Sequence, residues 1–286
     1  MNEQNLSYLK DNVKYMGFGE KLYPALEEQL KIQPAEFSLK ADANYLKDTI
    51  DATLHFRKSD QSDMYFFNRY DATLTRDNDK DNPLSQTFYV NRGQGITLKE
   101  AYNLLDGRAV NKDLTNNEGV KYNAWVQLNF DEKDKNNNYK MSQYHENYGY
   151  DLANAVSKLP LKELGNGEQK NALIKSLEKG NVQSVTFEKA GISEKMFIDA
   201  NPQFKTVNVY DGQMKRVQSQ ALNEKFGIVR EPKPSVNDEQ KKDVSKNQEI
   251  KPEVKKNLKT DQKQNKTESL LPKKRVSTKK GMSLSK

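Results

Sequence analysis

Alternation of apolar and polar residues predicts several β-strands. Residues 50–56 carry Ile, Ala, Leu and Phe at every second position, and residues 120–130 repeat the alternation without a break. This period of two is typical of a strand that buries one of its faces. Further strands are expected at residues 64–74, 87–90, 139–144, 182–188, 195–200 and 205–210.

Apolar residues three or four positions apart predict helices between these strands. Leucines at every fourth position mark the first helix, near residues 20–31. Another begins after Thr97, because Thr97 and Glu100 have the spacing of a capping box. Later helices are expected near residues 152–159, 173–177 and 214–226, and Gly227 ends the last of them.

The order of these elements predicts an α+β fold with mostly antiparallel sheets and helices on one face. Residues 26–41 and 173–190 both read as a helix followed by a strand. This similarity indicates either two related modules or a chance likeness between amphipathic segments. We expect an N-terminal module at residues 1–145, a second module at residues 146–230, and a tail at residues 231–286.

The composition of the predicted tail differs from that of the rest of the chain. Residues 231–286 hold 16 of the 47 Lys and Arg residues but only 8 of the 40 Asp and Glu residues. The tail therefore carries a net charge of about +8, and the remainder is close to neutral. The tail has no aromatic residue and four prolines. Since it cannot bury enough apolar surface to offset ordering, we expect it to be disordered.

Basic residues near the end of the chain are the predicted nucleic-acid contacts. They lie within eight positions and have no acidic residue between them: Lys273, Lys274, Arg275, Lys279 and Lys280. Such a cluster is typical of a nucleic-acid patch. The alternative is a tail that only keeps the protein soluble.

Three aromatic residues are candidates for stacking on nucleic-acid bases. Trp125 lies among polar neighbours on the polar side of its strand, and an exposed aromatic in that setting can stack on a base. The alternative is that another element covers this face and buries the indole. Tyr65 and Phe67 pose the same choice, because strict alternation places them opposite Met64 and Phe66.

Residue types with catalytic potential are scarce. The chain has no cysteine and two histidines, His55 and His145, which are distant in sequence. No nucleophile elbow or paired-carboxylate motif stands out. The turn at residues 93–95 precedes a helix and has two glycines, but it lacks the lysine of a phosphate loop. We therefore expect no enzymatic activity, no cofactor and no metal site.

Four segments resemble a family of uncharacterised Bacteroidota proteins that are often encoded on conjugative elements, near topoisomerase and mobilisation genes. They are residues 63–70, 98–105, 122–126 and 200–205. The resemblance implies a bacterial cytoplasm and a DNA-processing context, and it carries over no catalytic residue. The N-terminal residues show no basic segment followed by an apolar one, so no secretory signal is expected.

Together these observations favour a cytoplasmic accessory protein of a mobile element that is not an enzyme. Its folded region would bind a protein partner, and its tail would contact nucleic acid without sequence specificity. The competing hypothesis is a purely protein-binding module with a solubilising tail. Neither hypothesis includes a membrane, and the oligomeric state is left open.

Overall fold

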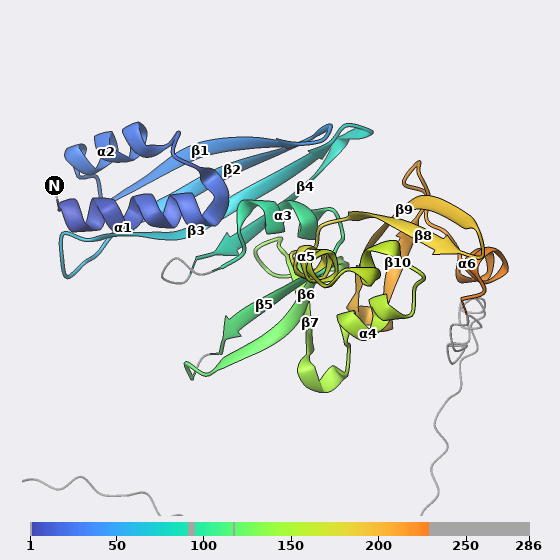
Figure 1. Cartoon of the computed structure of the whole chain (residues 1–286). Helices are drawn as coiled ribbons and strands as arrows, with labels where there is room; N and C mark the ends of the chain where they lie inside the picture. The colour runs from blue at the N-terminus through green and yellow to red at the C-terminus, as the bar shows by residue number, and fades with distance from the viewer. Residues whose placement is uncertain (1, 91–94, 117, 229–286) are drawn as a thin grey trace, which may run out of the picture. The chain divides into compact units, whose positions relative to one another are not determined.

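The computed structural model describes residues 2–90, 95–116 and 118–228, and it confirms the α+β fold (Figure 1). The strands within this part of the chain form three antiparallel sheets. By its internal contacts the chain divides into two units, Met1–Pro232 and Lys233–Lys286. The predicted disordered tail, residues 231–286, lies outside the described residues.

The first sheet is a four-stranded meander with the order β1-β2-β3-β4. Leucine, isoleucine and aromatic residues at alternate positions supply its buried face, and the polar residues between them form the other face. Its strands are β1 (Glu36–Tyr45), β2 (Asp48–Lys58), β3 (Tyr65–Arg76) and β4 (Asp79–Tyr89).

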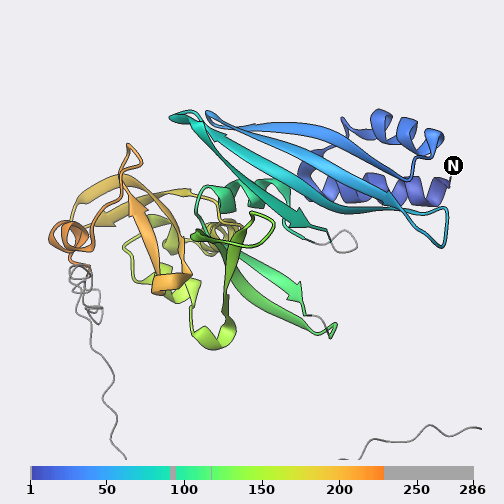
Figure 2. The same cartoon turned by 180° about the vertical axis from the view of Figure 1, so that it is seen from behind.

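Helices cover the buried face of this sheet. Figures 1 and 2, which are views from opposite sides, show α1 and α3 on the same side of the strands. The capping box predicted at Thr97 is confirmed: the Thr97 side chain accepts from the Glu100 amide, and the Glu100 carboxylate accepts from the Thr97 amide. The helical elements of this part are α1 (Glu3–Val13), the π-helical turn η1 (Lys14–Phe18), α2 (Tyr23–Ile32) and α3 (Leu98–Leu105).

Two three-stranded sheets follow, with the orders β5-β6-β7 and β10-β9-β8. The first contains β5 (Val110–Thr115), β6 (Lys121–Lys133) and β7 (Tyr139–His145). The second contains β8 (Gln183–Lys189), β9 (Ile192–Asn201) and β10 (Thr206–Tyr210). The helices of this part are α4 (Leu152–Ser157), α5 (Gly167–Glu178) and α6 (Ser219–Phe226), with short 3-10 turns η2 (Glu146–Tyr148), η3 (Lys162–Gly165) and η4 (Pro202–Phe204).

Strand β6 contributes to two separate hydrophobic clusters. Val126 and Leu128 pack into a first cluster with the β1–β4 sheet, whereas Trp125, on the opposite face, packs into a second cluster with β8–β10. Both faces of the middle of β6 are therefore buried. The division between the clusters consequently does not coincide with the predicted module boundary at residue 145.

A close junction joins α3 to the segment that follows α5. The Asn103 side-chain amide donates to the Lys179 carbonyl at 2.6 Å and to Asn181 Oδ1 at 3.0 Å. Between these acceptors, Gly180 has a φ of +76°, and a Cβ there would lie 2.8 Å from the Ala109 carbonyl oxygen. Glycine is required at this position, both for its backbone conformation and for the close approach.

Three local predictions need correction. Helix α1 precedes the helix predicted as the first; Asn5 and Asn12 lie on its buried side and interrupt the apolar stripe. The last helix begins at Ser219, because the residues from 214 form a turn and a strand-like pairing instead. Finally, β3 has an extra residue, Asn68, opposite β2. This bulge reverses the alternation, so Tyr65 and Phe67 share a face with Tyr70.

Candidate functional site

The three aromatic residues considered for base stacking are buried. Trp125 contacts Tyr150 edge to face, with ring centroids 5.3 Å apart. Tyr65 donates its hydroxyl proton to the Pro34 carbonyl at 2.7 Å, and Phe67 stacks on Phe56. The structure thus agrees with the burial alternative, because these rings present no open face to a base.

The other sequence candidates fall largely outside the described residues. The basic cluster, Lys273, Lys274, Arg275, Lys279 and Lys280, lies in residues 229–286, and most of the glycine turn lies in residues 91–94. The structure therefore does not place these candidates. Of the two histidines, His145 ends β7 and packs against the Tyr122 ring, and His55 lies on the outer side of β2.

The outer face of the β1–β4 sheet, defined as the face opposite α1 and α3, gathers aromatic and basic side chains near the β2–β3 turn. Strand register brings them together: Arg57 pairs with Phe66, and Arg69 pairs with Tyr89. Phe66 and Tyr89 are exposed, whereas their sequence neighbours on the inner face are buried. Shallow depressions of about 440 and 340 Å³ lie here, and Arg57 and Asn68 line both of them.

A hydrogen-bonded group occupies the middle of the outer face. Asp71 Oδ2 lies 2.7 Å from His55 Nε2, and its Oδ1 accepts from the Thr87 hydroxyl at 2.7 Å. Burial alone would raise the Asp71 pKa, but the hydrogen bonds from Thr87 and His55 outweigh it and leave the pKa lowered. This arrangement keeps Asp71 charged and orients His55, but it places no nucleophile beside the imidazole.

The far end of the outer face is acidic. Asp42 on β1 pairs directly across from Asp51 on β2, and both side chains are exposed. Like charges opposite each other on a sheet repel. The outer face therefore has an aromatic end near the β2–β3 turn, where Arg57 lies beside Glu36 and Asp60, and an acidic end away from it.

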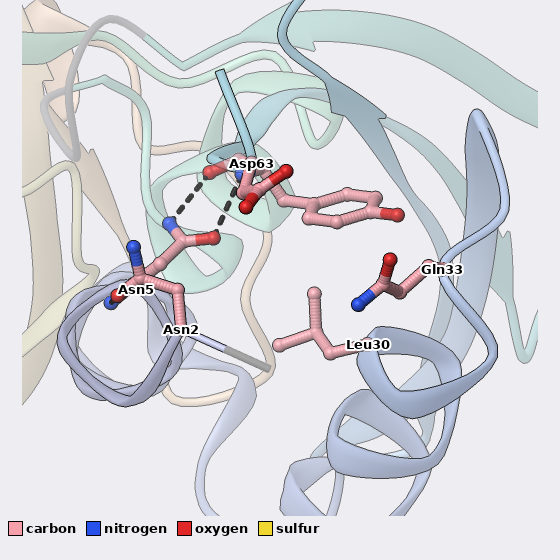
Figure 3. Close-up of a pocket in the computed structure, with 6 residues that line it drawn as sticks. Asn2, Asn5, Leu30, Gln33 and Asp63 are labelled. Carbon is pink, nitrogen blue, oxygen red and sulfur yellow. Dashed lines mark hydrogen bonds between the residues drawn. The ribbon is translucent and has the colours of Figure 1, made fainter.

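The small pocket between α1, α2 and the start of β3 has a structural explanation (Figure 3). Its volume is about 250 Å³. Asn5, which is almost fully buried, donates to the Tyr65 carbonyl at 2.9 Å and accepts from the Tyr65 amide at 2.7 Å. The side chain thus pairs with β3 as a neighbouring strand would, and both of its polar groups are satisfied.

Lys99 on α3 lies against two aromatic rings and near the Arg108 guanidinium. Its ammonium lies 3.9 Å from the Tyr45 ring centroid and 4.4 Å from that of Tyr102. Burial and the nearby Arg108 guanidinium lower the Lys99 pKa to about 8. Burial, together with Asp106, raises the Tyr102 pKa to about 12.

Asp199 is a buried carboxylate on β9 that is held by hydrogen bonds. Asp199 accepts from the Asn208 amide at 2.7 Å and from the Tyr210 hydroxyl at 2.9 Å. Burial raises the Asp199 pKa, although the hydrogen bonds from Tyr210 and Asn208 oppose this effect. Because the group is enclosed and hydrogen-bonded, it fixes the pairing of β9 with β10.

An open cleft of about 480 Å³ lies between β4 and the β5–β7 sheet. Its lining is mainly apolar and includes Leu114, Tyr139 and Met141. At its side, Lys112 forms an ion pair with the largely buried Glu100 at 3.0 Å. This cleft has the size and composition of a site for an apolar side chain or a small ligand.

The described residues show neither a metal-binding group nor a membrane span. Within residues 2–90, 95–116 and 118–228, no three His, Asp or Glu side chains gather as metal ligands would. No helix in the same ranges is long and apolar enough to cross a bilayer.

Comparison with protein-family models, with curated proteins and with solved structures gives no match to this chain.

Proposed function

We propose that this chain is a non-enzymatic accessory protein of a mobile genetic element. Its folded region binds a protein partner, and its basic tail contacts nucleic acid without sequence specificity. The mobile-element context rests on the family resemblance of the four segments named above. The two binding roles rest on features of this chain.

The uneven distribution of charge carries the proposal. Of the net charge of +7, residues 231–286 contribute about +8 and the remainder about −1. Phosphate contacts dominate non-specific binding to nucleic acid and require clustered Lys and Arg. The tail offers such a cluster at Lys273, Lys274 and Arg275. The folded region instead contains an apolar cleft, which suits a protein side chain better than a phosphate.

Fluorescence anisotropy of labelled DNA tests the role of the tail. Binding of about four to five phosphates predicts a log–log salt slope of roughly −3 to −4 and micromolar or weaker affinity at physiological salt. Removal of residues 231–286 should abolish duplex binding. Replacement of the five clustered basic residues by Gln is the matched variant, because it keeps the length of the tail.

Two outcomes would contradict this proposal. Equal duplex binding by the full chain and the truncated chain would locate the phosphate contacts in the folded region. Absence of binding by the full chain at low salt would favour the alternative, a protein-binding module whose tail only keeps it soluble. The net charge of the folded region is close to zero, and this observation supports the alternative.

A further inference from the structure

Two exposed aromatic rings lie on the outer face of the β1–β4 sheet. Phe66 is 40% exposed and Tyr89 is 60% exposed, whereas Phe67 and Phe88 beside them are buried. Both rings contact solvent although the other outer positions of β3 and β4 carry polar residues, and Tyr89 also lines the open cleft between β4 and the β5–β7 sheet. Clustered exposure of this kind marks binding surfaces more often than single exposed residues do.

The spacing of the two rings is fixed by strand register. Tyr89 pairs with Arg69, and the Val90 amide donates to the Asn68 carbonyl, so on the β4 side Phe66 lies three positions beyond Arg69. Phe66 and Tyr89 therefore lie on the same face of adjacent strands, farther apart than directly paired residues. Two bases of one unstacked strand can occupy separate platforms of this kind.

Basic and amide groups accompany the rings. The Arg69 side chain makes no hydrogen bond or ion pair within the described residues, and its charge helps to lower the pKa of Asp71 on the same strand. Arg57 lies 3.6 Å from Glu36 and 3.5 Å from Asp60, and these exposed ion pairs are long. Exposed pairs contribute little to stability, so the Arg57 guanidinium can move away from these carboxylates at small cost. Asn68 adds a side-chain amide between the two arginines.

We propose that Phe66, Tyr89, Arg57 and Arg69 form a binding site for single-stranded nucleic acid on the outer face of the β1–β4 sheet. The rings stack on two bases of one strand, and the guanidinium groups contact the phosphates between them. Bases inside a duplex are already stacked on one another, so a sheet face reaches only unpaired ones. The acidic pair of Asp42 and Asp51 confines the strand to the aromatic end.

This inference extends the proposed function, because it adds a folded single-strand site to a tail that binds phosphates non-specifically. The two roles give different signatures. Tail contacts depend on salt and are shared by single strands and duplexes. Stacking contacts act on single strands alone, because the bases of a duplex are already stacked on one another.

The test measures anisotropy with the full-length chain, an oligothymidine probe and a duplex of equal length. Phe66→Ala and Tyr89→Ala should each weaken oligothymidine binding by at least about 5-fold and leave duplex binding unchanged. Unlike Tyr89→Ala, Tyr89→Trp should bind oligothymidine with the affinity of the wild type. Oligothymidine should quench the emission of the introduced tryptophan. Tyr15→Ala is the matched control, because Tyr15 is 73% exposed and lies on η1, outside this face.

Charge variants complete the experiment. Arg69→Gln should weaken binding to the single strand more than Lys121→Gln does, because Lys121 lies at the start of β6. The inference fails if the Phe66 and Tyr89 variants bind oligothymidine like the wild type, or if Tyr15→Ala has the same effect. Loss of duplex binding on tail removal, with no effect of the sheet variants, would support the tail role and overturn the sheet site alone.

Discussion

Replacement of Val126 by Asp places a carboxyl group at the most enclosed point of β6. Val126 is 0% exposed and packs into the first hydrophobic cluster. Loss of the buried valine costs about 1.5–3 kcal/mol, and an unpaired neutral carboxyl adds about 1–3 kcal/mol. Holding that carboxyl protonated at pH 7, against an unfolded pKa near 3.9, costs up to about 4 kcal/mol more. The sum is comparable with the whole stability of a domain.

The pH dependence separates these contributions. The pKa of the introduced carboxyl is raised in the folded state, so the folded protein binds more protons than the unfolded chain above about pH 4. The free energy of unfolding of the variant, relative to wild type, therefore falls as the pH rises from about 4 to 7. Val126→Asn has a similar shape and does not titrate, so its deficit relative to wild type should stay constant over that range.

Urea unfolding followed by circular dichroism at about pH 4 and pH 7 measures both effects. Val120→Asp is the control, because Val120 is 56% exposed and precedes the same strand; it should change stability by no more than about 0.5 kcal/mol. If Val126→Asp is too unstable to fold at pH 7, Val126→Ala should still lose about 2 kcal/mol. A Val126→Asp protein within about 1 kcal/mol of wild type at pH 7 would refute the assignment of this face to the core.

Four further predictions concern other buried or half-buried groups. Trp125, as the only tryptophan, should show blue-shifted emission that oligothymidine leaves unchanged in the wild type, and a red-shifted emission would contradict its burial. Because the Lys99 pKa is lowered to about 8, the unfolded chain binds more protons between about pH 8 and 10; stability should rise over that range in urea titrations, and less so in Lys99→Gln. Above about pH 10, the raised pKa of Tyr102, about 12, should make stability fall again. Asn5→Ala leaves the Tyr65 amide and carbonyl unpaired and should cost about 2–4 kcal/mol by urea unfolding, whereas a loss below about 0.5 kcal/mol would show that water replaces the side chain.

Local signals in the sequence predicted much of the secondary structure. The capping box of Thr97 and Glu100 acts within one helical turn, and the alternation in residues 120–130 gives β6 directly. Structural features that depend on the pairing between strands were not predictable from such local signals. The bulge at Asn68 is defined by pairing with β2, and it reversed the expected faces of β3. Helix α1 was missed because its buried asparagines carry no apolar signal.

The candidate sites show the same limit. Trp125 lies among polar neighbours in the sequence, and only the second cluster, built from later residues, covers it. Phe66 and Tyr89 lie on different strands, and register alone makes them neighbours on the outer face. A usable signal was present at residues 88–89, where two consecutive aromatics in a strand must point to opposite faces. The positions of the helices are also needed to decide which of the two faces contacts solvent.

The double burial of β6 determines how this chain can be divided. A fragment ending at residue 145 would retain Val126 in its cluster but would expose the Trp125 and Ala109 surface that residues 152–228 cover. The complementary fragment would lose Ala109 and Trp125, which belong to the second cluster. Both pieces would present contiguous apolar surface to water, a condition that promotes aggregation. Gene fusions and exchanges that keep the protein soluble should therefore transfer the two clusters together, with their boundaries outside residues 1–228.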